Sequence, residues 1–140
     1  MTYRKVTIRP YRPQDESRLF ALARDSFGER PAWSAEGTLA TLETDTVFVA
    51  ELEDEPAGYV AVEQEGDVVR IEQLLVSPLH EHQGVGHQLL DYAEGYAISA
   101  GARRLQVVVE EDNVKARDFY RRRGFVAAAR GLLELTLPQR

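Results

Sequence analysis

The sequence predicts a mixed α/β fold in which antiparallel strands come first and a parallel pair of strands accompanies a long helix, with further helices at the flanks. Three observations carry this prediction. Strand-like patterns occupy residues 5–9 and most of 47–76, the apolar spacing becomes helical from Val85, and another strand-like run follows at Leu105–Val109. Because 140 residues is a common length for one compact domain, we expect residues 1–140 to form a single domain.

The N-terminal third is expected to hold one strand and two helices. Apolar and polar residues alternate over Lys5–Arg9, which indicates the strand. A helix should begin near Asp15, with Leu19, Leu22, Ala23 and Phe27 on its apolar face. Ser34 has the side chain of a helix N-cap, and we expect a short helix after it that carries Leu39 and Leu42.

A three-stranded meander is predicted next. Residues 47–52 and 57–62 form a hairpin around the acidic turn 53–55, and a second turn at 65–67 leads into a third strand, Val68–Val76. Pro78 should end that strand because proline cannot donate a backbone hydrogen bond.

A long helix and a second strand-helix unit follow the meander. The helix should begin at Val85 and end at Gly101, with an inner face of Val85, Leu89, Ala93, Ala97 and Ala100. The run Leu105–Val109 predicts a buried central strand.

Asp112-Asn113 should open another helix, whose inner face carries Ala116, Phe119 and Tyr120. Gly124 suits the left-handed position after this helix, with Phe125 folding back, and Leu132–Leu137 predicts the last strand.

The composition excludes several classes of function. The chain has no cysteine, so disulfides, thiolate metal sites and a cysteine nucleophile are ruled out. A net charge of −6 argues against nucleic acid as a partner and agrees with a cationic substrate such as an amine. No segment has the pattern of a signal peptide or the roughly 20 apolar residues that span a bilayer. We therefore expect a soluble, cytoplasmic protein that does not bind a membrane.

The turn Gln83-Gly84-Val85-Gly86 lies between a strand and a helix, where an anion can bind. A helix N-terminus leaves about four backbone N–H groups unpaired and carries roughly half a positive charge. Glycines allow a phosphate to approach the backbone closely. The pattern alone is also compatible with a plain strand-helix turn. A P-loop is excluded because no Gly-Lys pair occurs, and the dinucleotide fingerprint is excluded because its third glycine is missing.

Two motifs resemble those of the GNAT acetyltransferase superfamily. Residues 74–90, which run through Val76-Ser77-Pro78 and Gln83-Gly84-Val85-Gly86 to Leu89-Leu90, resemble its acetyl-CoA motif. Asn113, Ala116, Tyr120 and Gly124-Phe125 resemble a second motif of the family, at the right distance downstream. The order of elements is also similar along nearly the whole chain. The resemblance implies acetyl-CoA as cosubstrate and direct attack of an amine on the thioester.

The resemblance also implies which residues hold the cofactor. Backbone groups of Leu74, Leu75 and Val76 would bind the pantetheine, for which a strand edge that is splayed open, commonly at a bulge, is required. The amides of residues 82–87 (His82, Gln83, Gly84, Val85, Gly86 and His87) would bind the pyrophosphate. Asn113 matches a cofactor-contacting residue of the family, although a plain helix N-cap is the alternative. Glu81 departs from the family, which usually has Arg or Gln at this position. Its carboxylate should repel the pyrophosphate.

Tyr120 matches the general acid of the family, with a core tyrosine as the alternative. A phenol has a pKa near 10 and a thiol near 8.5, so full proton transfer to the leaving thiolate is uphill by roughly 2 kcal/mol. Tyr120 is therefore expected to act mainly as a hydrogen-bond donor.

The general base has three candidates. Glu72 lies four residues before Val76 and shares its face of the strand if no bulge intervenes. Glu110 lies two residues after Val108, the position of the base in some relatives, and should share that face. Bulk water is the third candidate. The two histidines His80 and His82 lack an accompanying carboxylate pattern, so no metal site is expected.

The sequence therefore predicts an N-acetyltransferase that acts on a primary amine of a small molecule or peptide. The alternative is a non-catalytic acyl-CoA-binding module with the same fold. A homodimer is common in the family and is compatible with the chain.

Overall fold

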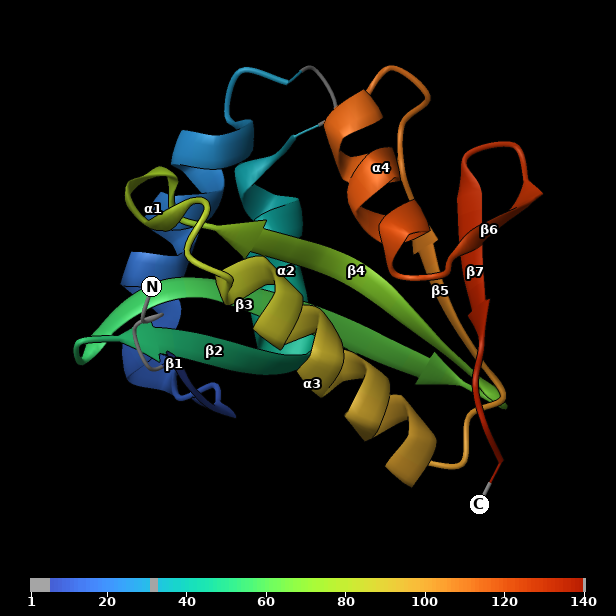
Figure 1. Ribbon diagram of the computed structural model, residues 1–140. Coiled ribbons are helices and arrows are strands. Elements are labelled where there is room, and N and C mark those ends of the chain that lie inside the picture. Colours follow the sequence, from blue (N-terminus) through green and yellow to red (C-terminus); the bar gives the residue numbers. More distant parts are fainter. Residues whose placement is uncertain (1–5, 31–32, 140) are drawn as a thin grey trace. The chain divides into compact units, whose positions relative to one another are not determined.

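The computed structural model describes residues 6–30 and 33–139 (Figure 1). Its elements, in chain order, are β1 (Val6–Pro10), the 3-10 turn η1 (Pro13–Asp15), α1 (Glu16–Phe27), α2 (Ala35–Thr44), β2 (Thr46–Leu52), β3 (Glu55–Glu65), β4 (Val68–Val76), the 3-10 turn η2 (Pro78–His80), α3 (Val85–Ser99), β5 (Arg104–Val108), α4 (Val114–Arg122), β6 (Val126–Ala129) and β7 (Leu132–Thr136). Lys5, where the first strand was predicted to begin, lies outside the described residues, and β1 is described from Val6.

The strands form a mixed sheet in the order β1-β2-β3-β4-β5-β7-β6. The pairs β1–β2, β2–β3, β5–β7 and β6–β7 are antiparallel, whereas β4 and β5 are parallel. This arrangement confirms the predicted mixed α/β fold, with antiparallel strands first and a parallel pair after them. The prediction missed β6, because its residues, Val-Ala-Ala-Ala, have neither alternation nor strong β propensity.

The chain divides into two compact units, which are described one at a time. The first unit holds the chain up to Val62 together with Gln73–Tyr92, and the second holds Glu63–Glu72 together with the chain from Ala93. The single domain expected for residues 1–140 stays a prediction.

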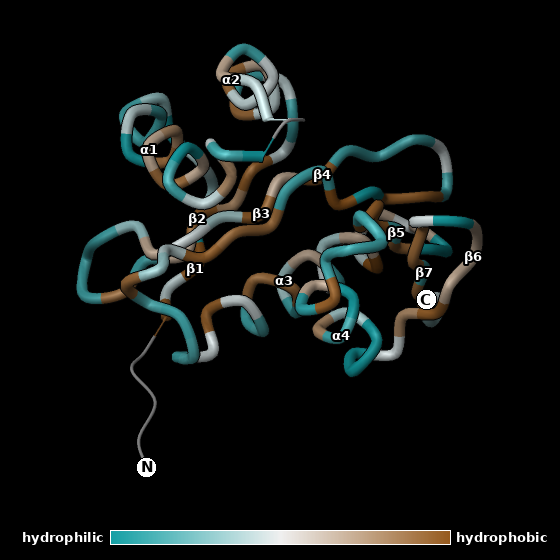
Figure 2. Tube along the Cα trace, turned by 90° about the horizontal axis from the view of Figure 1, so that it is seen from above, coloured by the Kyte–Doolittle hydropathy of each residue, from teal (hydrophilic) through white to brown (hydrophobic). Residues whose placement is uncertain are grey.

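The core of the first unit lies between the two N-terminal helices and the strands. Leu19 and Ala23 of α1 and Leu42 of α2 are fully or almost fully buried against Val47 and Val49 of β2, Tyr59 and Ala61 of β3, and Leu75 of β4. In Figure 2, α1 and α2 lie on one side of the largely apolar strands β2 and β3. The predicted apolar face of α1 is confirmed, and Ser34 caps α2 by accepting a hydrogen bond from the Gly37 amide at 2.9 Å.

The other face of these strands contacts the start of α3. The Phe48 and Tyr92 rings lie 4.7 Å apart. A Cβ atom added to Gly58 of β3 would lie 2.4 Å from the carbonyl oxygen of Leu75 and 3.3 Å from Leu89. The absence of a side chain at Gly58 therefore lets β3, the end of β4 and α3 approach closely.

We predict that Gly58→Ala destabilises the protein by about 1–3 kcal/mol, because the added methyl group collides with backbone that cannot rotate away. The matched control is Gly95→Ala in α3, where an added Cβ meets no atom within 4 Å. This control should stabilise the protein by about 0.5–1 kcal/mol, since alanine favours a helix interior. Urea denaturation measures both changes. Equal effects at the two glycines would contradict the account of Gly58.

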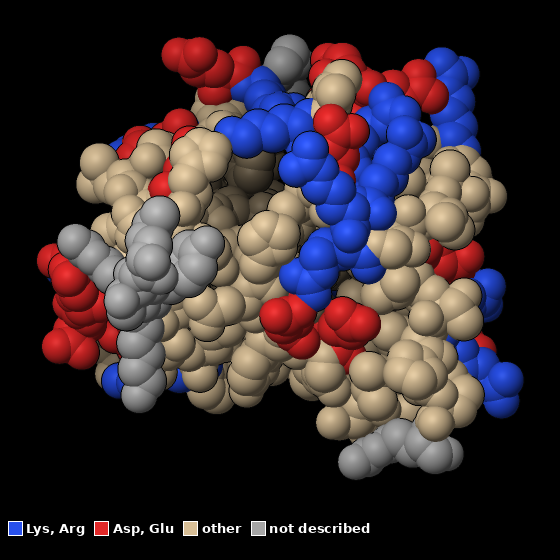
Figure 3. Space-filling model, in the orientation of Figure 1, with Lys and Arg blue, Asp and Glu red and all other residues tan. Residues whose placement is uncertain are grey.

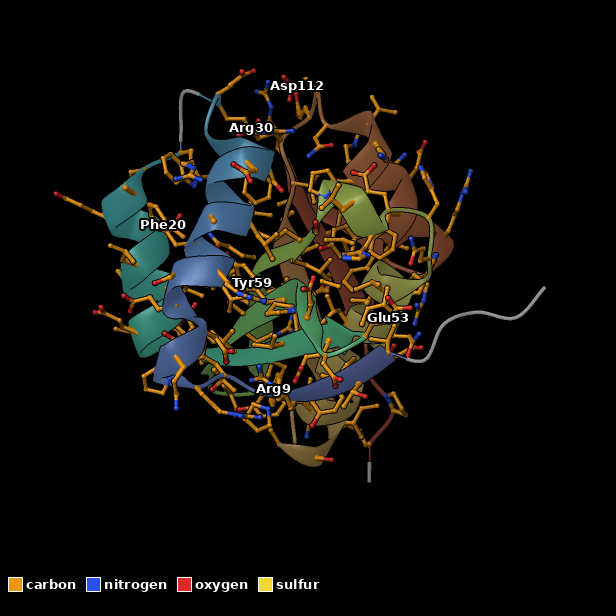
Figure 4. All side chains as sticks on the ribbon, turned by 90° about the vertical axis from the view of Figure 1, so that its left-hand side faces the viewer. Arg9, Phe20, Arg30, Glu53, Tyr59 and Asp112 are labelled. Carbon is orange, nitrogen blue, oxygen red and sulfur yellow. The ribbon has the colours of Figure 1, made fainter. Side chains whose placement is uncertain are left out.

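A charged cluster links β1 to η1 and β2. Both Nη atoms of Arg9 donate to the Asp15 carboxylate at 2.8 Å, and its Nε donates to Glu51. Figure 4 labels Arg9 at the foot of this unit. Asp15 makes no side-chain capping hydrogen bond to α1. Its carboxylate instead accepts from the Arg12 amide. The hydrogen bonds from Arg9 hold the pKa of Asp15 below its usual value.

The lowered pKa gives a pH-dependent prediction. The pairing of Asp15 stabilises the fold at pH values above about 4 and is lost as the pH falls through the lowered pKa. Asp15→Asn should therefore cost about 1.5–3 kcal/mol at pH 7, and its difference from the wild type should shrink in acid. Asp25→Asn is the control, because the Arg24–Asp25 pair is more than half exposed. Urea unfolding between pH 2 and pH 7 measures both. A constant Asp15→Asn difference across this range would contradict the assignment.

The second unit combines the first half of β4 with β5, β7, β6 and α4. Its buried side chains include Val69 and Ile71 of β4, Leu105 and Val107 of β5, Tyr120 of α4, Phe125, and Leu133 of β7. Gly124 has a φ of 96°, and the Phe125 amide donates to the Tyr120 carbonyl at 3.1 Å. The predicted chain reversal at Gly124-Phe125 is therefore confirmed.

Two predictions of burial in this unit are wrong. Ala100 is exposed, because α3 ends at Ser99 and the chain turns through Gly101, and Ala102 is buried instead. Val108 is 67% exposed, so the run at 105–109 is not buried throughout. Burial alternates along β5, as in a strand covered mainly on one face. Among the described residues, no helix has both the length and the apolar character needed to cross a membrane.

Candidate active site

The predicted site residues fall into two groups, one in each unit. The first group lies at the end of β4 and the start of α3. Here Leu74, Leu75 and Val76 complete β4, and the Ser77 amide donates to the Ala57 carbonyl at 2.7 Å. Ser77 then caps η2, because its hydroxyl accepts from the Leu79 amide at 3.3 Å. The turn that follows is therefore fixed at its β4 end by hydrogen bonds to β3 and within η2.

The turn into α3 depends on two residues with left-handed backbone. His82 has a φ of 64° and Gly84 a φ of 81°. A left-handed conformation is unusual for a residue with a side chain, and it clusters at ligand sites. Gly84 has no neighbour within 4 Å of an added Cβ atom. Glycine is therefore favoured at this position by the left-handed backbone conformation and not by close contact with neighbouring atoms.

The N-terminus of α3 has the properties of an anion site. The helix begins at Val85, as predicted, and the Gly84 carbonyl accepts from the Gln88 amide at 3.1 Å. Its first turn contains no acidic residue, so no carboxylate of that turn neutralises the helix dipole. Glu81 is exposed, where solvent screens its repulsion of an anion.

Two buried polar atoms in the same segment lack partners. Among the described residues, neither Nδ1 of His80 nor Oε1 of Gln83 has a hydrogen-bond partner. A buried polar atom left unpaired costs about 1–3 kcal/mol, so a ligand or water that reaches either atom recovers that free energy.

The middle of β4 changes its facing pattern between Glu72 and Gln73. Glu72 lines a groove of about 230 Å³ with Glu63, Glu65, Val68, Arg70 and Gln106. Gln73 accepts a hydrogen bond from the Tyr59 hydroxyl. Because Tyr59, Glu63 and Glu65 are alternate residues of β3, they share one side of that strand, so Glu72 and Gln73 face the same side. Two consecutive residues on one side of a strand indicate a β-bulge. The shared face of Glu72 and Val76 was expected only if no bulge intervened, so that expectation does not apply here.

The parallel pairing of β4 with β5 ends near this point. The register runs from Val68 opposite Arg104 to Ile71 opposite Val107, although β4 continues to Val76 and β5 to Val108. The backbone of β4 beyond Ile71 therefore lies outside the stretch that pairs with β5. An extended ligand that pairs with a strand needs backbone groups in such a position.

The second group of site residues lies in the second unit and centres on Tyr120. This residue of α4 is 5% exposed, and its ring meets those of Phe119 and Phe125 edge-on at 5.2 Å. Burial raises the pKa of the Tyr120 phenol above its usual value. The phenol is therefore held neutral at physiological pH, with its proton available for a hydrogen bond.

Asn113 caps α4. Its Oδ1 accepts from the Ala116 amide at 3.2 Å, which is the structural role that the sequence left open for it. A cofactor contact through its other side-chain atom, Nδ2, stays a prediction.

Glu110 lies outside β5. The strand ends at Val108, and the Glu110 carbonyl accepts from the Asn113 amide at 3.0 Å in the turn before α4. The expected shared face of Glu110 and Val108 stays a prediction, and burial agrees with it, because both residues are exposed and Val109 between them is buried. In contrast, Glu72 belongs to β4 and lines a groove.

Comparison with known proteins decides the family. The model of the acetyltransferase (GNAT) family matches residues 10–125. The chain belongs to this family. The match covers the glycine turn, Tyr120 and Phe125.

Curated relatives of this GNAT chain include archaeal proteins. An uncharacterized N-acetyltransferase of Methanocaldococcus jannaschii, MJ1207, is 32% identical over 88 residues, which cover 58% of this chain and 39% of that protein. One of Archaeoglobus fulgidus is 30% identical over 89 residues, covering 59% of this chain and 60% of that protein. The matches thus span between about two fifths and three fifths of these relatives.

Solved structures share the fold over nearly the whole chain. The ribosomal-protein-S18-alanine N-acetyltransferase of Escherichia coli superposes with a TM-score of 0.81 at 18% identity, covering 97% of this chain and 96% of that one. The PaiA N-acetyltransferase of Thermoplasma acidophilum, in complex with coenzyme A, gives 0.80 at 18% identity, covering 94% and 99%. A GNAT acetyltransferase of Staphylococcus aureus Mu50 gives 0.83 at 13% identity, covering 96% and 100%.

Sequence reasoning overlooked Gly58 and did not locate the β4 bulge, although both shape the site. Gly58 lies inside a strand, where an isolated glycine is a known signal for close backbone approach. The bulge has no such signal, because the alternation of Arg70, Glu72 and Leu74 looks regular in the sequence. In the described part of the chain, no group of three or more His, Cys, Asp or Glu side chains has a metal-binding arrangement.

Proposed function

We propose that this GNAT chain transfers an acetyl group from acetyl-CoA to a primary amine of a small molecule or peptide by direct attack. The observation that carries the proposal is the left-handed glycine turn between β4 and an α3 N-terminus without acidic residues. Family membership supports acyl transfer in general. The coenzyme A complex of the PaiA enzyme supports an acyl-CoA donor for this fold.

The residues of the first unit fit the donor. The backbone N–H groups of residues 82–87 would hold the pyrophosphate at the positive end of α3. The backbone of Leu74, Leu75 and Val76 would pair with the pantetheine amides. The end of the β4–β5 register at Ile71 supports this pairing, because the later residues of β4 lie beyond the stretch that pairs with β5.

Tyr120 would stabilise the thiolate that leaves when the amine attacks. Its raised pKa makes complete proton transfer to sulfur more unfavourable than for an ordinary tyrosine. A hydrogen bond from the neutral phenol to the developing negative charge avoids this cost. We therefore assign Tyr120 as a hydrogen-bond donor in the transition state.

The attacking amine must lose a proton, and we propose Glu72 as the base. Glu72 comes directly before the change of face in β4 and lines a groove with two other glutamates. Such acidic surroundings favour the approach of a cationic amine, in agreement with the net charge of −6. Glu110 and bulk water are the alternatives.

A thiol-release assay tests the proposed activity. Acetyl-CoA is incubated with a panel of diamines, amino acids and short peptides, and the free thiol of coenzyme A is detected with a chromogenic disulfide. The chain has no cysteine, so the protein contributes no signal. Amine-dependent release supports the enzyme. Tight acetyl-CoA binding without release from any amine would favour the alternative, a non-catalytic acyl-CoA-binding module.

We predict that Tyr120→Phe lowers kcat by about 10- to 1,000-fold with little change in the affinity for acetyl-CoA, because the lost hydrogen bond forms mainly in the transition state. Steady-state kinetics and calorimetry measure the two quantities. Phe119→Leu provides a control for altered packing around the ring. An unchanged kcat in Tyr120→Phe would remove the assigned role.

The base is tested by the pH dependence of kcat/KM. In Glu72→Gln we expect the ionisation of the base to disappear from the profile, while Glu110→Gln keeps the wild-type profile. The reverse result would assign the role to Glu110. Wild-type profiles in both variants would leave water as the base and would contradict the assignment of Glu72.

The remaining expectations are also proposals. We place the protein in the cytoplasm, acting on a soluble amine and not on nucleic acid or a membrane surface. A homodimer agrees with the family and is tested by light scattering.

A further inference from the structure

Basic residues are concentrated in one short part of the chain. Between Val114 and Arg130 the sequence has six Lys or Arg side chains and one acidic side chain, leaving 11 basic and 22 acidic residues elsewhere. Figure 3 shows basic side chains gathered over α4. The dipole of α4 favours arginines in its last turn, at Arg121 and Arg122. It does not explain Arg117, one turn earlier, or Arg130, outside the helix.

Three of these arginines line one groove in the second unit. The groove has a volume of about 500 Å³ and combines the flank of α4 with the β6–β7 hairpin and the loop before α4. We call it the arginine groove. Its lining residues are Val109, Glu111, Arg117, Arg121, Ala127, Ala129, Arg130, Gly131, Leu132 and Leu133. The small side chains of β6 leave space over the hairpin, and the arginines form its walls.

The arginines of the groove differ in their present partners. Arg130 donates to the Glu111 carboxylate at 2.9 Å, and Arg117 donates to the Glu111 carbonyl at 2.7 Å. For Arg121 the structure gives no ion pair or hydrogen bond of the side chain with any described residue. Arg117 and Arg121 also repel each other at a spacing of four residues. An anion in the groove would relieve this repulsion and satisfy Arg121.

Half of the residues that line the groove are exposed to solvent. Arg121, Arg130, Ala127 and Ala129 are exposed, so the groove cannot enclose a small molecule as ligand pockets usually do. An open groove with apolar side chains at its base and arginines at its walls suits a partner that brings apolar and acidic side chains together.

We propose that the arginine groove binds an extended acidic peptide segment of a partner protein. Carboxylates of the segment pair with Arg121 and Arg117, and its smaller or apolar side chains lie over Ala127 and Ala129. Nucleic acid fits less well, because a longer polyanion would extend from this patch over a chain that is otherwise strongly acidic. No residue of the groove belongs to the glycine turn, and the proposed binding does not depend on acetyl transfer.

The test uses the full chain and a fluorescein-labelled peptide of alternating glutamate and threonine, with the glutamine-threonine peptide as its uncharged counterpart. Fluorescence anisotropy at physiological ionic strength should show binding of the glutamate peptide only. Arg121→Glu should weaken its affinity by at least about tenfold. Arg122→Glu changes the charge of the neighbouring α4 residue, which does not line the groove, and should have less than about a threefold effect. Circular dichroism checks that both variants fold.

Four results would overturn the proposal. Equal losses in the two variants would show a general charge effect rather than a groove. Tighter binding of an oligonucleotide of the same charge would indicate nucleic acid as the ligand. Competition by coenzyme A, with weaker coenzyme A binding in Arg121→Glu, would assign the groove to the donor site. Concentration-dependent self-association of the wild type, lost in Arg121→Glu, would identify the occupant as a second copy of the chain.

Discussion

The start of α3 is the structural constraint on which the proposed chemistry depends. A helix that begins after a strand exposes unpaired N–H groups, and these bind an anion only if the chain approaches in a conformation that leaves them accessible. Gly84 supplies that conformation through its positive φ, and the first turn of α3 has no carboxylate to compete for the amides. Gly58 fixes the position of the turn, because its missing side chain lets the end of β4 and Leu89 of α3 lie against β3.

The second unit provides a contrasting environment for Tyr120. Its phenol is buried among the rings of Phe119 and Phe125, which raises its pKa and keeps it neutral. The same burial makes the phenol a weaker acid. These two effects together favour a role in which Tyr120 stabilises negative charge through a hydrogen bond without losing its proton. Burial thus decides between two chemical roles that the residue type alone allows.

Most of the fold was predictable because local signals agree with the tertiary structure. Alternation, glycine turns and Ser34 identified β1 to β4, both N-terminal helices and the start of α3. The predictions failed where the conformation depends on contacts with distant parts of the chain and not on the local sequence. The alanines of β6 have no intrinsic strand preference and pair because β7 lies beside them. The face of Glu72 depends on a bulge that the alternation along β4 does not reveal. The residues of the glycine turn were recognisable, because their backbone conformation restricts which residues can occupy it.

The most direct test of the account is the affinity of two glycine variants for coenzyme A, measured by isothermal titration calorimetry. Gly84 and Gly66 both have positive φ and open space around an added Cβ atom, but only Gly84 belongs to the turn before α3. Valine at either position should cost similar stability, of about 1–2 kcal/mol. We expect Gly84→Val to weaken coenzyme A binding at least about tenfold, whereas Gly66→Val should bind like the wild type. Equal affinities in the two variants would contradict this expectation.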